Sequence, residues 1–241
     1  MKTNQHNGFT LIELLVVLAI IGILAALLLP ALNHSKRRGQ QIRCIGNLHQ
    51  LGIGLQVFLS NNHGYPAVFQ TTNEDFAGTW LEQLERGGLG IANPTTNFYQ
   101  QGIWHCPSAQ WHNVRAAEFG SYGYNGFGVQ SMGDRTSSPG LSGHFVKGSG
   151  FRPIAETEVS TPSEMMAIGD GDGNSFFMRE NLVARETNEN ILTRHGGRAN
   201  VVFCDAHVES PKLEFLFENT SDEALSRWNR DHQPHREMLQ P

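Results

Sequence analysis

The sequence has few charged residues and few cysteines. Asp, Glu, Lys and Arg make up 17% of its 241 residues, against about a quarter in ordinary soluble domains. The net charge is −5 and no long basic run occurs, which argues against nucleic acid as a partner. Three cysteines exclude a disulfide-rich miniprotein. Hydrophobic residues reach 39%, enough to fill a core, so the low charge does not indicate disorder.

Sequence patterns of the common catalytic sites are also missing. The chain has no nucleophile elbow, no phosphate-binding loop and no HExxH zinc motif. Glu156 and Glu158 alternate along the chain and are better explained as an exposed pair than as a catalytic dyad. We therefore predict that the protein is not an enzyme.

The N-terminal region contains a long run without charge. No charged side chain occurs from Leu14 to Ser35, and Lys36-Arg37-Arg38 follows directly. As a helix, this run would be about 33 Å long, enough to cross a hydrocarbon core of about 30 Å. A cleaved secretory signal and a plain anchor are both open interpretations, although the small-x-small cleavage pattern after the run is poor. Glu13 lies at the start of the run, where a carboxylate is costly, and is therefore a functional candidate.

The residues around Glu13 resemble a known export signal. The stretch Gly8-Phe9-Thr10-Leu11-Ile12-Glu13, continued by apolar residues up to Leu24, looks like the class III signal of type IV prepilins and type II secretion pseudopilins. The resemblance implies that a prepilin peptidase cleaves after Gly8 and N-methylates Phe9. It makes Glu13 the family's characteristic acid and places Pro30 where relatives often carry a helix-kinking proline.

The new N-terminus and Glu13 would carry opposite charges. An unpaired carboxylate is costly in apolar surroundings, so Glu13 is expected to pair with the Phe9 ammonium of the same or an adjacent subunit. Such a pair can set the register of helices in a filament. Pro30 has no amide hydrogen to donate, so we expect a kink or local melting of the helix there.

Apolar residues resume at helical spacing after the basic triplet. They recur every three or four positions, at Ile42, Ile45, Leu48, Leu51, Leu55, Phe58 and Leu59. The stripe predicts that the helix packs against a head domain, although Gly46, Gly52 and Gly54 weaken it by about 1 kcal/mol each. One helix over about residues 9–61 would then have a membrane half and a packed half.

The remaining sequence predicts a small, loop-rich antiparallel β head. We expect a helix over 79–86, strands over 103–107, 121–125, 164–170, 199–204 and 207–209, and a last helix over about 221–230. A capping box of Thr220 and Glu223 would begin that last helix, and the Gly- and Ser-rich stretch 131–150 predicts a surface loop. The fold class is thus α+β and pilin-like. Its parts are a leader at 1–8, a transmembrane assembly half-helix at 9–35 and a periplasmic or extracellular head at 36–241.

The C-terminal region carries a second resemblance. His195 and Asp205 are separated by nine residues, as in the His–nine residues–Asp–Gly motif of a large bacterial pseudopilin-like family. Ala206 replaces the glycine of that motif. If Asp205 and Ala206 form a two-residue hairpin turn, both need positive φ. Alanine would then cost about 1 kcal/mol, or the turn would have another geometry.

Four residues in this region are candidate metal ligands: Asp170, His195, Asp205 and His207. In a two-residue hairpin His207 would lie opposite Cys204, and a Zn²⁺ site could form there. The alternative is a structural network in which His195 and Asp205 bond to each other or to turn backbone. Asp170-Gly171-Asp172-Gly173-Asn174 suggests Ca²⁺ instead, although Ser175 and Asn181 do not fit the EF-hand template.

The cysteines and aromatic residues allow further interpretations. Cys44 on the packed half-helix and Cys106 on a nearby segment are expected to form a disulfide, worth roughly 4 kcal/mol in the chain-entropy model; the alternative is three buried thiols. A group of aromatic residues favours core packing over a carbohydrate platform: Trp104, Trp111, Tyr122, Tyr124 and Phe127.

These observations favour a structural subunit of a type II secretion pseudopilus or a type IV pilus-like filament. Its expected partners are the prepilin peptidase, other pilin-like subunits and the assembly machinery. Its expected location is the inner membrane, single-pass with a periplasmic head, and after assembly a periplasmic pseudopilus or a cell-surface filament. The alternative is a membrane-anchored glycan- or metal-binding module that does not polymerise, and a remote third is an anchored metallohydrolase.

Overall fold

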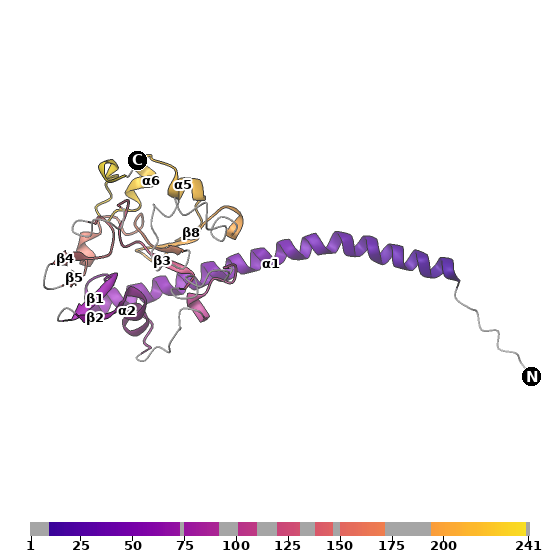
Figure 1. Cartoon of the computed structure of the whole chain (residues 1–241), viewed down its shortest axis with the longest axis horizontal. Coiled ribbons are helices and arrows are strands. Elements are labelled where there is room, and N and C mark those ends of the chain that lie inside the picture. The colour runs from indigo at the N-terminus through magenta and orange to yellow at the C-terminus, as the bar shows by residue number, and fades with distance from the viewer. Residues whose placement is uncertain are drawn as a thin grey trace, which may run out of the picture. The chain divides into compact units, whose positions relative to one another are not determined.

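The computed structural model describes residues 10–72, 75–91, 101–109, 120–130, 138–146, 150–171 and 194–239. The chain divides into two compact units, residues 1–39 and residues 40–241. One helix, α1 (Leu11–Asn62), contributes to both units (Figure 1). Its length agrees closely with the helix expected over residues 9–61.

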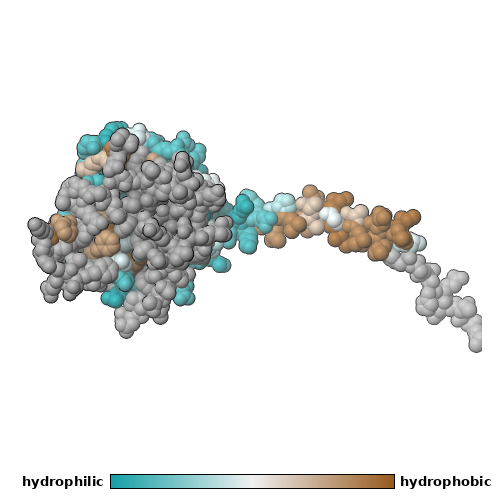
Figure 2. Space-filling view, in the orientation of Figure 1, coloured by the Kyte–Doolittle hydropathy of each residue, from teal (hydrophilic) through white to brown (hydrophobic). Residues whose placement is uncertain are grey.

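The first part of α1 presents apolar side chains to its surroundings. Every large apolar residue from Leu11 to Leu32 is exposed, and brown hydrophobic surface covers this part of the helix in Figure 2. The stretch is long and apolar enough to cross a membrane. Pro30 lies inside the helix, which continues without interruption, so the local melting considered for this position does not occur in the structure.

The second part of α1 supplies a large share of the head core. Its buried residues are Cys44, Asn47, Leu48, Leu51, Gly52, Gly54, Leu55, Phe58 and Leu59. Ile42, which the sequence placed in the buried stripe, is 58% exposed, because burial on α1 begins only at Cys44. Gly52 and Gly54 allow neighbouring segments to approach the helix closely. An added Cβ at Gly52 would lie 2.6 Å from Val202, and one at Gly54 would lie 2.7 Å from Leu89.

A four-stranded antiparallel sheet forms the centre of the head, in the order β3-β6-β7-β8. These strands are Tyr122–Tyr124, Met166–Asp170, Val201–Phe203 and Val208–Glu209. Neighbouring residues of β7 point to opposite faces. Val202 joins the core cluster that contains Leu48, Leu51 and Leu55 of α1. Val201 and Phe203 join a second cluster beneath the C-terminal helices. The sheet is therefore covered on both faces.

Smaller elements surround this sheet. Two hairpins are formed by β1 (Phe69–Thr72) with β2 (Asp75–Thr79) and by β4 (His144–Val146) with β5 (Gly150–Arg152). The short α-helices are α2 (Trp80–Gly87), α5 (Leu213–Phe217) and α6 (Asp222–Ser226). Single 3₁₀ turns occur at Gly102–Trp104, Glu156–Glu158, Arg194–Gly196 and Arg236–Met238. The architecture is α+β with a pilin-like layout.

Three local expectations were wrong. Residues 103–107 contain a 3₁₀ turn instead of a strand, because the Gly102 φ of 59° turns the chain before Trp104. Helix α6 is capped by Ser221, whose hydroxyl accepts from Ala224 N at 3.3 Å, and not by Thr220. It ends at Ser226, earlier than expected.

A further correction concerns the Gly- and Ser-rich stretch, which was expected to be a surface loop. Within residues 131–150, positions 138–143 are buried, although this stretch has little apolar content. A Cβ at Gly140 would lie 2.4 Å from Gly128 N, so backbone packs directly on backbone here. Arg230 donates to the carbonyls of Ser138 and Gly140, which supplies the polar partners that buried backbone requires.

Candidate functional site

Thr10 and Glu13 form a reciprocal capping arrangement at the start of α1. Glu13 Oε2 accepts hydrogen bonds from Thr10 N at 2.8 Å and from Thr10 Oγ1 at 2.7 Å. Glu13 N lies 3.3 Å from Thr10 Oγ1. This arrangement satisfies amide groups that have no partner within the helix. Both bonds to the carboxylate use Oε2, so Oε1 can accept from a second donor.

The other processing residues are only partly described. Gly8 and Phe9 lie outside the described residues. Pro30 lies within the exposed apolar part of α1. The part of the molecule that would enter a membrane or a helix bundle therefore carries one carboxylate, held at its first turn.

Asp205 and His207 bond to each other on the surface of the head. Asp205 Oδ1 accepts from His207 N at 3.1 Å and lies 2.6 Å from His207 Nδ1. The His207 ring stacks on Phe203, with centroids 4.3 Å apart, and its Nε2 lies 3.4 Å from Glu209. Both side chains are 38% exposed. The pair stabilises the turn and its flanking strand.

The turn itself differs from the expected two-residue hairpin. Phe203 N bonds to His207 O, and Ala206 N bonds to Phe203 O, both at 2.9 Å. Three residues therefore connect the strands, and His207 lies opposite Phe203 instead of Cys204. Ala206 alone takes a positive φ, of 74°. This is the three-residue hairpin in which a type I turn precedes one left-handed residue.

Asp170 and His195 meet at the other end of the sheet. His195 Nε2 lies 3.3 Å from Asp170 Oδ2, and both side chains are 1% exposed. Asp170 Oδ2 also accepts from Asn200 N at 2.7 Å. Because Met166 pairs with Phe203 at the opposite end of β6, the turn at Asp205 is about 13 Å away along the strand. The four candidate ligands thus form two separate pairs, and His195 bonds to neither Asp205 nor its turn.

A disulfide lies beside the Asp170–His195 pair. It joins Cys44 of α1 to Cys106, with Cα atoms 5.1 Å apart, and both cysteines are fully buried. Asn47 Nδ2 donates to His105 O at 2.8 Å, which fastens the same two segments. Cys106 Sγ lies 3.4 Å from His195 Nε2. Sequence spacing did not reveal this contact, since residues 44, 106 and 195 come from three distant parts of the chain.

Cys204 is the cysteine outside the disulfide. Burial raises the pKa of its thiol to about 12, and Tyr65 hydrogen-bonds to it. A buried thiol with a raised pKa is a poor nucleophile and a poor metal ligand. Cys204 therefore has a packing role.

The aromatic group is a core feature. Trp104, Tyr122, Tyr124 and Phe127 are at most 3% exposed, and Trp80 stacks on Tyr124 with centroids 5.0 Å apart. Trp111 and the sequence 172–193, which includes most of the candidate calcium loop, lie outside the described residues. The described members of this group therefore offer no exposed platform for a sugar.

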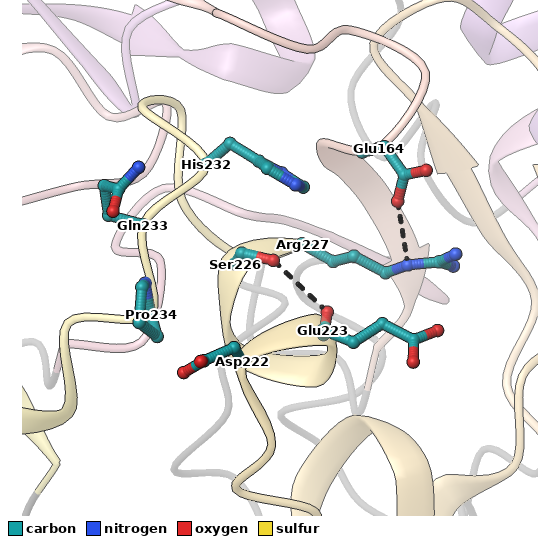
Figure 3. A pocket seen from close by; sticks show the side chains of 8 residues that line it. All are labelled: Glu164, Asp222, Glu223, Ser226, Arg227, His232, Gln233 and Pro234. Atoms are coloured by element: carbon teal, nitrogen blue, oxygen red, sulfur yellow. Dashed lines mark hydrogen bonds and ion pairs between the residues drawn. The ribbon is translucent and has the colours of Figure 1, made fainter.

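An open polar cavity of about 570 Å³ lies between α6 and the C-terminal segment. Figure 3 shows Arg227 directed to Glu164, and the Arg227 Nε to Glu164 Oε2 distance is 3.2 Å. Arg227 also bonds to Glu209 at 2.8 Å and lies over the Phe203 ring. The arginine thus joins α6, β8 and the segment before β6, and we interpret the cavity as a structural junction.

Comparison with known proteins supports the interpretation of the N-terminal region. Residues 3–29 match the family model of the prokaryotic N-terminal methylation motif. The chain is 32% identical over 125 residues to type II secretion system core protein G of Escherichia coli, covering 50% of this chain and 79% of that protein.

Two further relatives extend the comparison. Type II secretion system core protein G of Vibrio cholerae is 30% identical over 114 residues, which cover 46% of this chain and 70% of that protein. Fimbrial protein Q of Moraxella bovis is 53% identical over 45 residues, which cover 19% of this chain and 29% of that protein. No solved structure matches.

Proposed function

Because this chain belongs to the family of type II secretion system core protein G, the pseudopilins, we propose that it is a structural subunit of a type II secretion pseudopilus or of a type IV pilus-like filament. In this proposal a prepilin peptidase cleaves after Gly8 and N-methylates Phe9. The mature protein is then held in the inner membrane by one helix, with its head in the periplasm, until it joins a filament.

One observation carries the proposal: an apolar half-helix with a single carboxylate at its first turn. A plain anchor needs only the apolar residues, since a carboxylate makes insertion less favourable by about 2.5–3.5 kcal/mol at the bilayer centre and by less near the interface. Glu13 keeps Oε1 as an acceptor while Oε2 bonds to Thr10. It can therefore pair with the Phe9 ammonium of an adjacent subunit when helices bundle.

The head supports a periplasmic location. A buried disulfide joins Cys44 and Cys106, and disulfides persist in oxidising compartments such as the periplasm. The glycan-binding alternative loses its main support, because the described members of the aromatic group are buried. A non-polymerising anchor remains as the competing function for the experiment to decide.

The test separates insertion from assembly. Wild type, Glu13→Val and the charge-retaining control Glu13→Asp are expressed with prepilin peptidase and the assembly machinery, and membrane yield and filament incorporation are scored separately. Glu13→Val should insert at least as well as wild type, because a charge is removed, but should be lost from filaments. Glu13→Asp should retain more incorporation than Glu13→Val. Filaments that contain Glu13→Val at wild-type levels would overturn the role of Glu13 in assembly, and wild type that inserts into the membrane but never enters filaments would favour the non-polymerising anchor.

N-terminal mass spectrometry of the same samples tests processing. The mature wild-type chain should begin at Phe9 and carry one N-methyl group. Gly8→Val should block cleavage, because a branched side chain crowds the scissile bond. Cleavage near Ala31 would instead identify the region as an ordinary secretory signal.

A further inference from the structure

Three potential metal ligands converge between α1, the segment 101–109 and the turn at residues 194–196. The Sγ atoms of Cys44 and Cys106 and a ring nitrogen of His195 all lie within 4.8 Å of one another. Asp170 adds a carboxylate oxygen 3.3 Å from His195 Nε2. Thiolate, imidazole and carboxylate are the three ligand types that zinc takes in proteins.

The polar atoms of this group are incompletely satisfied. Within the described residues, His195 Nδ1 and Asp170 Oδ1 are buried without a hydrogen-bond partner. Buried polar atoms are normally hydrogen-bonded, so this histidine and this carboxylate, whose other polar atoms His195 Nε2 and Asp170 Oδ2 face each other, call for an explanation. His195 also has a φ of 53°, a left-handed conformation that non-glycine residues adopt infrequently. Backbone strain of this kind is concentrated at functional positions.

The observed separations match the edges of a zinc tetrahedron. Metal–ligand distances near 2.3 Å for sulfur and near 2.0–2.2 Å for nitrogen and oxygen give edges of about 3.5 Å between S and N and about 3.3 Å between N and O. The Cys106 Sγ to His195 Nε2 distance is 3.4 Å, and the His195 Nε2 to Asp170 Oδ2 distance is 3.3 Å. His195 Nε2 is thus one tetrahedral edge away from both Cys106 Sγ and Asp170 Oδ2. The ligand atoms that all lie within 4.8 Å of one another are those of Cys44, Cys106 and His195, so Asp170 would complete the site by a movement of its side chain.

We propose that Cys44, Cys106 and His195 bind one Zn²⁺ ion when the disulfide is reduced, with Asp170 as the fourth ligand. A thiol or phosphine reductant supplies two electrons to the sulfur–sulfur bond and becomes a disulfide or a phosphine oxide, and the two sulfurs take up two protons and become thiols. Zn²⁺ then replaces the two thiol protons, which are released to solvent. Two thiolate sulfurs on one zinc lie about 3.8 Å apart, a separation that rotation of the two side chains provides once the covalent bond is gone.

Charge balance favours both states of the group. In the disulfide state the Asp170 carboxylate lies 4.0 Å from the Arg194 guanidinium, and both side chains are at most 2% exposed. In the reduced state two thiolates and Asp170 carry three negative charges, which Zn²⁺ and Arg194 neutralise together. Buried charges are tolerated when they are compensated in this way. Thiolate ligands select zinc over calcium, which requires oxygen ligands.

Zinc binding would preserve the crosslink that reduction removes. The disulfide joins α1 to the segment 101–109, and the ion would hold the same two segments and add the turn at His195. The head would then keep this junction before oxidation of the exported chain or after its reduction. The four residues of this zinc site have no part in the proposed filament function, so the site and the filament function can each fail without the other.

The experiment uses the full chain in detergent. Wild type is either kept oxidised or reduced with a phosphine, which takes oxygen from water to become the phosphine oxide while the two hydrogens go to the sulfurs. Zn²⁺ affinity is measured by competition with a chromophoric chelator, and Co²⁺ serves as a spectroscopic probe. We expect one additional Zn²⁺ site per chain in the reduced protein only, thiolate-to-Co²⁺ charge-transfer absorption, and a higher Tm of the reduced protein with Zn²⁺.

Variants of two proposed ligands and of one control histidine test whether Zn²⁺ binds at the proposed site. His195→Gln and Asp170→Asn should each weaken the additional site by about 10-fold or more, whereas His207→Gln, which changes an exposed imidazole, should leave it unchanged. Near-UV circular dichroism of the oxidised variants verifies that each still folds. The proposal is overturned if reduced wild type binds no more Zn²⁺ than oxidised wild type, or if His195→Gln binds as tightly as wild type.

Discussion

Ala206 holds the β7–β8 turn in a conformation that suits glycine better. Its φ is 74°, and a left-handed conformation costs an L-residue about 1–2 kcal/mol. The hairpin is nevertheless well fixed, because His49 Nδ1 lies 3.2 Å from Ala206 O and Gln56 donates to Cys204 O at 2.5 Å. Contacts with α1 therefore compensate for the strain at Ala206.

Ala206→Gly should raise the free energy of unfolding by up to about 1 kcal/mol, because glycine adopts positive φ without strain. The loss of a mostly buried methyl group reduces the gain. Ala199→Gly is the matched control, since Ala199 is fully buried and has no positive φ, and it should destabilise. Denaturant unfolding of both variants gives the comparison, and a destabilised Ala206→Gly would show that the methyl contact outweighs the strain.

Glu85 should make stability depend on pH. It is 4% exposed, burial raises the pKa of its carboxyl from the ordinary value of 4.5, and Trp104 Nε1 donates to it at 2.6 Å. Because its pKa is raised in the folded state, protonated Glu85 contributes stability that is fully present below pH 4.5 and is lost as pH rises through the folded value.

Glu85→Gln removes this titration and keeps an acceptor for Trp104. We expect the variant to gain stability relative to wild type as pH rises from 4.5 to 7. Urea unfolding of both proteins at several pH values in this range measures the difference. A difference that stays constant with pH would mean that Glu85 does not titrate as described.

The partner of the His195 side chain could not be predicted from the sequence. Its spacing from Asp205 suggested a partner, and the strands around both residues were placed nearly correctly. The observed partner is Asp170, because antiparallel register brings the end of β6 next to the start of β7. Register depends on side-chain packing across strands, which a single sequence does not state.

At the scale of the element, α1 shows how glycines can be misread. Their low helix propensity suggested a weakened helix, but Gly52 allows close contact with β7 and the turn that follows it. An added Cβ there would lie 2.6 Å from Val202 Cγ2 and 3.1 Å from Ala206 Cα. Apolar periodicity did predict the existence and length of the helix, because that pattern is local.

Two glycines of α1 should respond oppositely to substitution by alanine. Gly46→Ala meets no atom within 4 Å and should stabilise by up to about 1 kcal/mol through helix propensity. Gly52→Ala should destabilise by about 1–3 kcal/mol, because the methyl group overpacks the contact with β7. Thermal and denaturant unfolding of the pair would measure this contrast, and equal effects at both positions would refute the packing argument.

At the scale of the whole molecule, the disulfide links residues 62 apart in sequence. The chain-entropy model assigns a loop of this length about 4 kcal/mol of stability. Reduction without added metal should lower the free energy of unfolding by an amount of this order, measured by denaturant unfolding with and without reductant. Mass mapping of the exported protein under non-reducing conditions should show Cys44 linked to Cys106 and Cys204 free. A linkage to Cys204 would contradict the structure.

The position of Cys44 along α1 also has a mechanical consequence. It is the first buried residue of the helix, ahead of Leu48, Leu51 and Leu55. Tension applied to the N-terminal part of α1 would therefore reach a covalent bond before it reached these non-covalent contacts. The force would be transmitted through the disulfide bond to the segment around Cys106. The helix could therefore not detach from the head one turn at a time.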